Sequence, residues 1–332
     1  MEESREKVTR KNFLRGGVLA LATAVVLGGL VHVFGGAGAL WEVVREADPG
    51  WVLVSLAAAT ACVLLGALRW QLVLRAIGYR LPYGRSLSVL LAVWPLGLVT
   101  PSRANELLRA FTVRELVPLP AGAGSVLAEK AVDLLVLLGL AAMGAAFAGQ
   151  GLLAALLAAA AVAELALLAL LMRARRWLLS LAILRSRAAS LELLFDAFEA
   201  LRHAPYRLAG VGVVSLVIRV LTVVITHALL LAVGARVPLL LTLTLWPTAT
   251  FAGLVPVTMA GMGTRDAAFL YLVNHAGASV DHASVLAATM AYSAVAIWSF
   301  AILGLPFMFR EAARRRAAVA ASGAASASPP SP

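Results

Sequence analysis

The sequence predicts an all-α integral membrane protein built from eight apolar segments. Of the 332 residues, 61% are hydrophobic and only 14% are charged, which leaves too little polar surface for a soluble domain of this size. The mean hydropathy is +0.91. Several apolar runs approach the roughly 20 residues that cross a bilayer as a helix. Because backbone groups in hydrocarbon must bond within the chain, continuous Leu, Ala and Val runs favour helices.

The apolar segments fill the chain between two tails. They lie at about 14–34, 51–77, 86–100, 121–148, 151–172, 207–234, 238–256 and 283–309. The basic tail 1–13 is expected to be cytoplasmic, and the Ala/Ser/Pro-rich tail 311–332 is expected to be disordered. The first segment resembles a twin-arginine export signal, but Lys11 replaces the second arginine. We therefore expect an uncleaved first transmembrane helix, and a membrane domain that covers 14–310.

The formal net charge of +11 comes from arginines clustered beside apolar runs. Such clusters mark cytoplasmic loops and attract anionic lipid headgroups. They predict membrane lipids, not nucleic acid, as partners and a multi-pass protein of a bacterial-type inner membrane. Cys62 is the only cysteine, so an intramolecular disulfide is impossible. No His/Cys/Asp cluster stands out, and no metal or cofactor is expected.

The positions of the arginines predict the topology. Strict alternation of eight crossings would place 173–207, the densest basic stretch, outside the cell, against the positive-inside rule. A re-entrant hairpin at 86–116, entering from the cytoplasm, removes this conflict. The basic cluster at 310–316 then requires a second hairpin at 238–278 from the opposite face. The result is about six spanning helices plus two oppositely oriented re-entrant hairpins, with both termini cytoplasmic.

The first predicted hairpin breaks at Pro101, next to three charged residues. Arg103, Glu106 and Arg109 are three residues apart, so on a helix they form a stripe along one side. Glu106 can pair with one arginine and leave the other guanidinium for a phosphate group. In the alternative interpretation, all three lie at the membrane surface and stabilise a loop.

Three more charged residues open the next helix. Glu129 and Asp133 are four residues apart and share a face, with Lys130 beside them. The two carboxylates can receive Arg103 or Arg109 from the hairpin. This pairing would either pin the hairpin or compete with an anionic headgroup for the arginines.

The second predicted hairpin breaks at Pro256 and is rich in glycine. Gly261 and Gly263 permit close backbone approach and positive φ. Thr264 is expected to cap the next helix. Arg265 and the N–H groups of the helix start would then form an anion site. Packing alone is the alternative explanation of these glycines.

Arg219 lies well inside the apolar segment 207–234. Charges within a membrane are costly and usually face a partner or a cavity. Asp266 or Asp133 is the expected counter-ion of this arginine. Glu164 is similarly deep in its segment and is expected to be neutral or paired.

Four stretches together resemble the flippase-like transmembrane domain of lysylphosphatidylglycerol synthases. They are Leu68 to Leu74, Pro101 to Arg109, Glu129 to Asp133, and Pro256 to Asp266. The resemblance covers roughly 14–310. The departures from the family's motifs are Asn105 for glycine, Lys130 for arginine, Ala260 for the first of two glycines, and Asp266 for glutamate.

The resemblance implies that the protein moves a lipid with a phosphate-bearing headgroup between membrane leaflets. The lipid would be a phospholipid, a glycolipid or a polyprenyl phosphate. Lysyl transfer is not expected, because the chain ends in a tail where the family's aminoacyl-transferase portion would stand. The expected substrate-binding residues are Pro101, Arg103, Glu106, Arg109, Pro256, Gly261, Gly263, Arg265 and Asp266. The expected gating or pairing residues are Glu129, Lys130, Asp133 and Arg219.

Two other functions stay open at this point. An intramembrane lipid-phosphate transferase or hydrolase could hold magnesium on the acidic residues, although each of them has a basic neighbour in the sequence. A non-transporting scaffold could instead bind an envelope-lipid synthase or a glycosyltransferase. We expect the flippase function and no enzymatic activity.

Overall fold

The computed structural model describes residues 28, 38, 41–42, 45–98, 106–180, 188–255, 257–277 and 280–326, with side chains except at 259 and 315–326. All regular elements within these ranges are helical. The basic tail and nearly all of the first apolar segment lie outside them. Four spans in the described part are long and apolar enough to cross a membrane: α3 (Pro49–Ala76), α7 (Gly151–Ser180), α9 (Pro205–Ala232) and His282–Arg314. The predicted class, an all-helical membrane protein, is confirmed.

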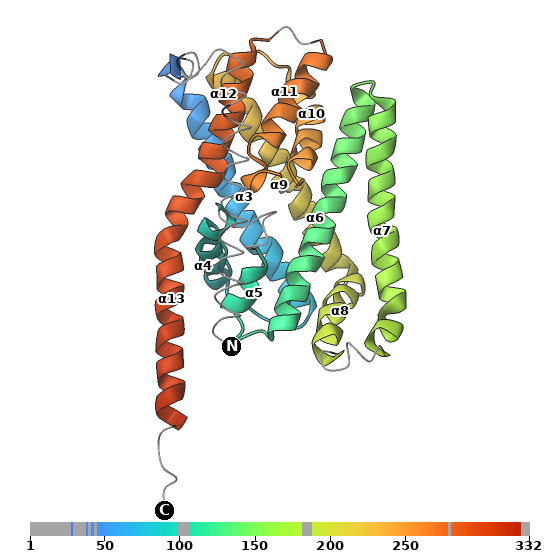
Figure 1. The fold of residues 1–332 in the computed structure, drawn as a ribbon, viewed down its shortest axis with the longest axis vertical. Coiled ribbons are helices and arrows are strands. Elements are labelled where there is room, and N and C mark those ends of the chain that lie inside the picture. The colour runs from blue at the N-terminus through green and yellow to red at the C-terminus, as the bar shows by residue number, and fades with distance from the viewer. Residues whose placement is uncertain are drawn as a thin grey trace, which may run out of the picture.

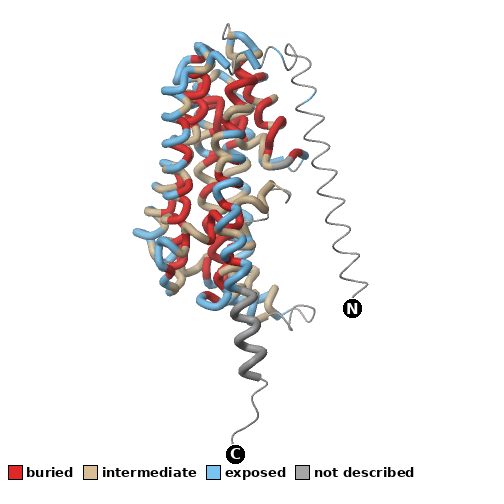
Figure 2. Tube along the Cα trace, turned by 90° about the vertical axis from the view of Figure 1, so that its left-hand side faces the viewer, coloured by how far each residue is buried: buried red, intermediate tan, exposed pale blue. Residues whose placement is uncertain are grey.

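The long helices form an elongated bundle (Figure 1). α3 and α9 pack against each other, and α6 (Leu119–Phe147) contacts both of them. α6 has 29 residues, but three charged residues interrupt its apolar sequence. Buried residues run along the inside of the bundle and exposed residues along its flanks (Figure 2). On α7 only Leu157 is buried, so most of this apolar helix is free to face lipid.

Two units of short helices lie between the long ones. α4 (Tyr83–Val93) and α5 (Leu108–Thr112) lie in the lower half of Figure 1, and α10 (Leu239–Ala252) and α11 (Thr264–His275) in the upper half. The 3₁₀ turn Pro95–Leu98 follows α4, and the 3₁₀ turn Met259–Gly261 precedes α11. The two turns lie close to each other. The helix breaks therefore fall where the two hairpins were predicted.

The C-terminal helix is continuous with the one before it. α12 (His282–Ser293) passes through the π-helical segment Ala294–Trp298 into α13 (Ser299–Ser326). Residues 311–326 are thus helical, where a disordered tail was expected, because this stretch is rich in alanine, a strong helix former. α8 (Ala188–Arg202) packs on α6 beside the lower end of α7.

Close helix packing depends on small residues, as two glycines illustrate. Gly144 of α6 lies against the backbone of Thr244 in α10, and Gly304 of α13 lies against the carbonyl of Leu91 in α4. A Cβ atom at either glycine would collide with backbone. Small residues allow helix backbones to approach in this way in membranes, where dispersion contacts replace the hydrophobic effect.

We expect Gly144→Val to lower the free energy of unfolding by about 1–3 kcal/mol, since the added carbons overpack the α6–α10 contact. The matched control is Gly139→Val on the same helix, where nothing lies within 4 Å of an added Cβ. The measurement is the melting temperature in detergent. Equal melting temperatures for the two variants would show that the close approach contributes nothing.

Candidate functional site

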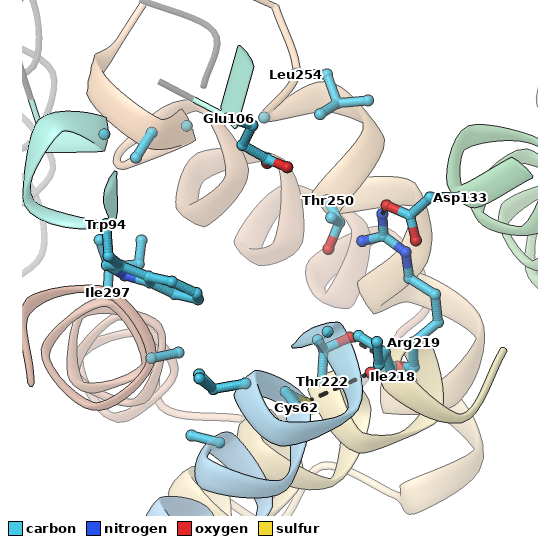
Figure 3. Close-up of a pocket in the computed structure, with 18 of the residues that line it drawn as sticks. Cys62, Trp94, Glu106, Asp133, Ile218, Arg219, Thr222, Thr250, Leu254 and Ile297 are labelled. Carbon is cyan, nitrogen blue, oxygen red and sulfur yellow. Dashed lines mark hydrogen bonds and ion pairs between the residues drawn. The ribbon is translucent and has the colours of Figure 1, made fainter. Parts of the chain in front are cut away.

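A cavity of about 220 Å³ lies at the centre of the bundle. Its walls come from α3, α6 and α9, from α12 and the π-helical segment after it, and from both units of short helices. Trp94 and Ile297 line one side, while Asp133 and Arg219 line the opposite side with Thr250 (Figure 3). The cavity thus has an apolar wall and a charged wall, which suits a ligand that has both an apolar part and a charged part.

The charged wall begins with a buried pair of carboxylates on α6. Glu129 accepts from Arg69 of α3 at 2.8 Å, and Asp133 accepts from the same guanidinium at 2.8 Å. Ser215 of α9 accepts from Arg69 as well, at 3.1 Å. The other oxygen of Asp133 accepts from Arg219 of α9 at 2.5 Å. These contacts join three helices at one level of the bundle.

The same wall continues to the first unit of short helices. Arg109 donates to Glu129 and to Glu106, at 3.3 Å in each case. Its guanidinium lies over the ring of Trp70, 5.0 Å from the ring centroid. Glu106 also contacts Lys130 of α6. Cations and anions therefore alternate along the wall from Lys130 to Arg219.

Arg265 belongs to a separate cluster on the second unit. It donates to its neighbour Asp266 at 2.8 Å and to Ser293 of α12 at 2.8 Å. It also lies over the rings of Tyr292 and Trp246, at 4.5 and 5.2 Å from their centroids. Both charges of the pair are at most 4% exposed, so this arginine is held rigidly at the edge of the cavity.

The turn before α11 has three residues with positive φ: Ala260 at 51°, Gly261 at 75° and Gly263 at 90°. The positive φ that the sequence permits at Gly261 and Gly263 is observed. The predicted cap at Thr264 is wrong: Gly263 is the N-cap residue, and its N–H donates to Asp266 at 2.9 Å. An internal carboxylate thus occupies a donor that we had expected to bind an external anion.

The structure brings most of the predicted residues together. The expected pairs of Arg109 with Glu106 and with Glu129 are present. Asp133 is the observed counter-ion of Arg219, whereas Asp266 pairs with Arg265. Pro101, Arg103 and Pro256, also predicted, lie outside the described residues.

Two features of the charged wall differ from expectation. Asp133 contacts Arg69 and Arg219, not Arg109. Arg69, which is only 6% exposed, was missed as a site residue because it stands near the end of an apolar segment, where a basic residue usually marks the membrane surface. Its position seven residues before the end of α3 was the available signal.

The charges of the cavity do not cancel. Among the described lining residues, five are cationic and three are anionic. Asp266, behind Arg265, adds a fourth anion, so the balance is 5 − 4 = +1. The cations are Arg69, Arg109, Lys130, Arg219 and Arg265, and the lining anions are Glu106, Glu129 and Asp133. A positive excess in a site of low dielectric favours an anionic ligand.

A family model for the lysylphosphatidylglycerol synthase TM region matches residues 17–304. The chain belongs to this family. Every lining residue of the cavity falls within the matched range. The resemblance inferred from the four sequence motifs is thereby confirmed for the lysylphosphatidylglycerol synthase TM region.

Two relatives match different shares of this chain. A UPF0104 membrane protein of Methanothermobacter thermautotrophicus is 22% identical over 321 residues, which cover 88% of this chain and 94% of the relative. The glycosyltransferase AglD of Haloferax volcanii is 29% identical over 139 residues, 41% of this chain. The matched part is 22% of the length of that glycosyltransferase. Family and relatives together indicate a membrane protein with a lipid-related function.

Proposed function

We propose that this protein binds the phosphate-bearing headgroup of a lipid in the charged cavity and moves the lipid between the leaflets of the inner membrane, without enzymatic chemistry. The observation that carries the proposal is a cavity whose described residues have a net charge of +1 and which lies between apolar helices, among them the membrane-length helices α3 and α9. Ionisable side chains inside a membrane domain usually serve a substrate pathway, because their insertion is costly. The apolar wall would contact the acyl or prenyl chains of the lipid.

The ion pairs of the cavity differ in length, and this difference suggests where a headgroup enters. Arg69 lies 2.8 Å from its two carboxylate partners, whereas Arg109 lies 3.3 Å from each of its own. Charge-assisted hydrogen bonds are strongest at about 2.7–2.9 Å. Arg109 therefore holds its carboxylates less tightly. A phosphate group would replace Glu106 or Glu129 at this guanidinium.

The test of the proposal is lipid movement in reconstituted vesicles. Phosphatidylglycerol with a fluorescent acyl chain is incorporated, and dithionite destroys the fluorescence of the outer leaflet. We expect vesicles with the protein to lose the protected inner-leaflet signal, and Arg109→Lys to slow this loss about tenfold, since lysine lacks the fork that binds phosphate at two points.

The matched control for this assay is Arg175→Lys. Arg175 also pairs with carboxylates, Asp196 and Glu199 of α8, but it does not line the cavity. Its replacement is expected to leave the rate unchanged. The assay is repeated with a glycolipid and with a polyprenyl phosphate. The translocase function would be refuted if, for all three lipids, the fluorescence loss matched that of protein-free vesicles.

The two units of short helices are proposed to be the re-entrant hairpins of this translocase, entering from opposite faces among six spanning helices. Their breaks meet near mid-height of the bundle, as in transporters with broken helices. Hairpins that move against the fixed helices would expose the cavity to one leaflet at a time.

Single cysteines introduced into a Cys62→Ser background test this topology with a membrane-impermeant maleimide. We expect Arg80→Cys and Glu115→Cys, at the ends of the first unit, to be protected in intact cells. Arg236→Cys and His275→Cys, at the ends of the second unit, are expected to be labelled. Labelling of one end of a unit but not of the other would mean that the unit crosses the membrane.

A scaffold for a glycosyltransferase is the second candidate function. The similarity to a protein named as a glycosyltransferase favours it. In that case a glycosyltransferase would purify with the protein from native membranes while reconstituted vesicles show no lipid movement. A magnesium-dependent enzyme is less well supported, because Glu106, Glu129, Asp133 and Asp266 each contact a cation of the chain.

A further inference from the structure

Two hydrogen-bond donors on residues that line the cavity have no partner among the described residues. Among the described residues, four buried side-chain polar atoms make no hydrogen bond, and two of these belong to residues that line the cavity: Nε of Arg219 and Oγ1 of Thr250. A buried donor without a partner costs about 1–3 kcal/mol. Two such donors in one cavity indicate a ligand that completes them.

The guanidinium of Arg219 is fixed by its ion pair. One terminal nitrogen donates to Asp133 at 2.5 Å, and the side chain is 11% exposed. Because a guanidinium is planar, this contact also sets the direction of the Nε–H bond. That donor is therefore held in one orientation.

The hydroxyl of Thr250 differs from those of several other helical threonines. Thr222, Thr226 and Thr244 each donate to a carbonyl three or four residues earlier, at 2.7–3.1 Å, as hydroxyls inside helices usually do. Thr250, in the last turn of α10, makes no such bond within the described part of the chain. Its hydroxyl is available to the cavity.

The two residues lie on the same side of the cavity, next to Asp133 (Figure 3). Arg219 comes from α9, a fixed long helix, whereas Thr250 comes from the broken unit α10–α11. An acceptor bound by both donors would connect the bundle to this unit. The net charge of +1 over the described residues of the cavity favours an anionic acceptor.

We propose that Nε of Arg219 and the hydroxyl of Thr250 form a subsite for the phosphate oxygens of a lipid headgroup. The inference rests on the proposed function of the cavity and adds two binding residues to it. The phosphate accepts both hydrogen bonds while Asp133 keeps its contact with Arg219. The second unit is thereby held against α9 when the lipid is bound and is released when the lipid leaves.

Native mass spectrometry of the purified full-length protein tests the subsite with three probes: phosphatidylglycerol, diacylglycerol and inorganic phosphate. We expect Thr250→Val and Arg219→Lys each to weaken phosphatidylglycerol binding about tenfold, as for the loss of a hydrogen bond to a charged group. Binding of diacylglycerol, which has no phosphate, should be weak and equal in all variants. Thr250→Ser keeps the hydroxyl and should bind as the wild type does.

Thr222→Val is the matched control, since Thr222 lines the same cavity but donates its hydroxyl to the carbonyl of Arg219. Equal binding of phosphatidylglycerol by Thr250→Val and Thr222→Val would overturn the subsite. The subsite would also be overturned if the wild-type protein bound phosphatidylglycerol no better than diacylglycerol. Thr250-dependent binding of inorganic phosphate but not of lipid would overturn the lipid as the source of the phosphate.

The lipid-movement assay separates this subsite from the translocase function. Thr250-dependent binding without lipid movement supports the subsite and refutes translocation. Lipid movement at the wild-type rate in Thr250→Val refutes the subsite and leaves the translocase intact.

Discussion

Replacing Glu129 by glutamine is expected to destabilise the protein by about 3–5 kcal/mol, the cost of breaking a buried ion pair from one side. Glu129 is 1% exposed and is shared by Arg69 and Arg109. The neutral amide would leave two buried guanidinium groups with too little negative charge. The measurement is unfolding in detergent, followed by circular dichroism with increasing denaturant.

The control for this effect is Glu115→Gln, which removes the same charge from an exposed position between α5 and α6. It is expected to change the stability by less than about 0.5 kcal/mol. If both glutamine variants unfolded like the wild type, the carboxylate of Glu129 would contribute no net stability, and the charged wall would be solvated in the folded protein.

Arg265→Ala is expected to have a comparable effect, because it leaves Asp266 charged and buried without its partner. The same change also removes the contacts with Trp246 and Tyr292. Since Asp266 caps α11 through the N–H of Gly263, the loss should spread to the start of this helix. Unfolding in detergent again gives the magnitude.

A double variant, Arg265→Met with Asp266→Asn, shows whether the loss comes from an unpaired charge. Both charges are then removed, and asparagine can still cap the helix. We expect it to recover most of the stability lost in Arg265→Ala, as neutral replacements of buried pairs often do. A double variant as unstable as the single one would instead assign the effect to packing on the aromatic rings.

The sequence was sufficient to predict local features of the fold. Apolar length predicted the long helices, and the expected hairpin ranges 86–116 and 238–278 contain the helix breaks after α4 and α10. Glu106 and Arg109, three residues apart, were paired correctly because the local helical geometry of the chain decides whether such residues meet.

Contacts between distant segments were predicted only in part: the pair of Arg219 with Asp133 was expected, but the contacts of Arg69 were not. Arg69 finds Glu129 and Asp133 some 60 positions along the chain, and no periodicity in either segment encodes that distance. The capping of α11 by Asp266 depends on the positive φ at Gly263, which the sequence permits but does not require. The hydroxyl of Thr250 has no hydrogen-bond partner within the described residues, and this could not be predicted from the sequence.

The π-helical segment Ala294–Trp298 determines which side of the last helix faces its neighbours. A π turn accommodates one residue more than an α turn does, so it shifts the rotational phase of everything after it by about 100°. Gly304 meets Leu91 only in the shifted phase. Relatives that lack one residue in this segment would need their small residue at another point of the helical wheel. The insertion and the glycine are thus expected to be gained and lost together during divergence.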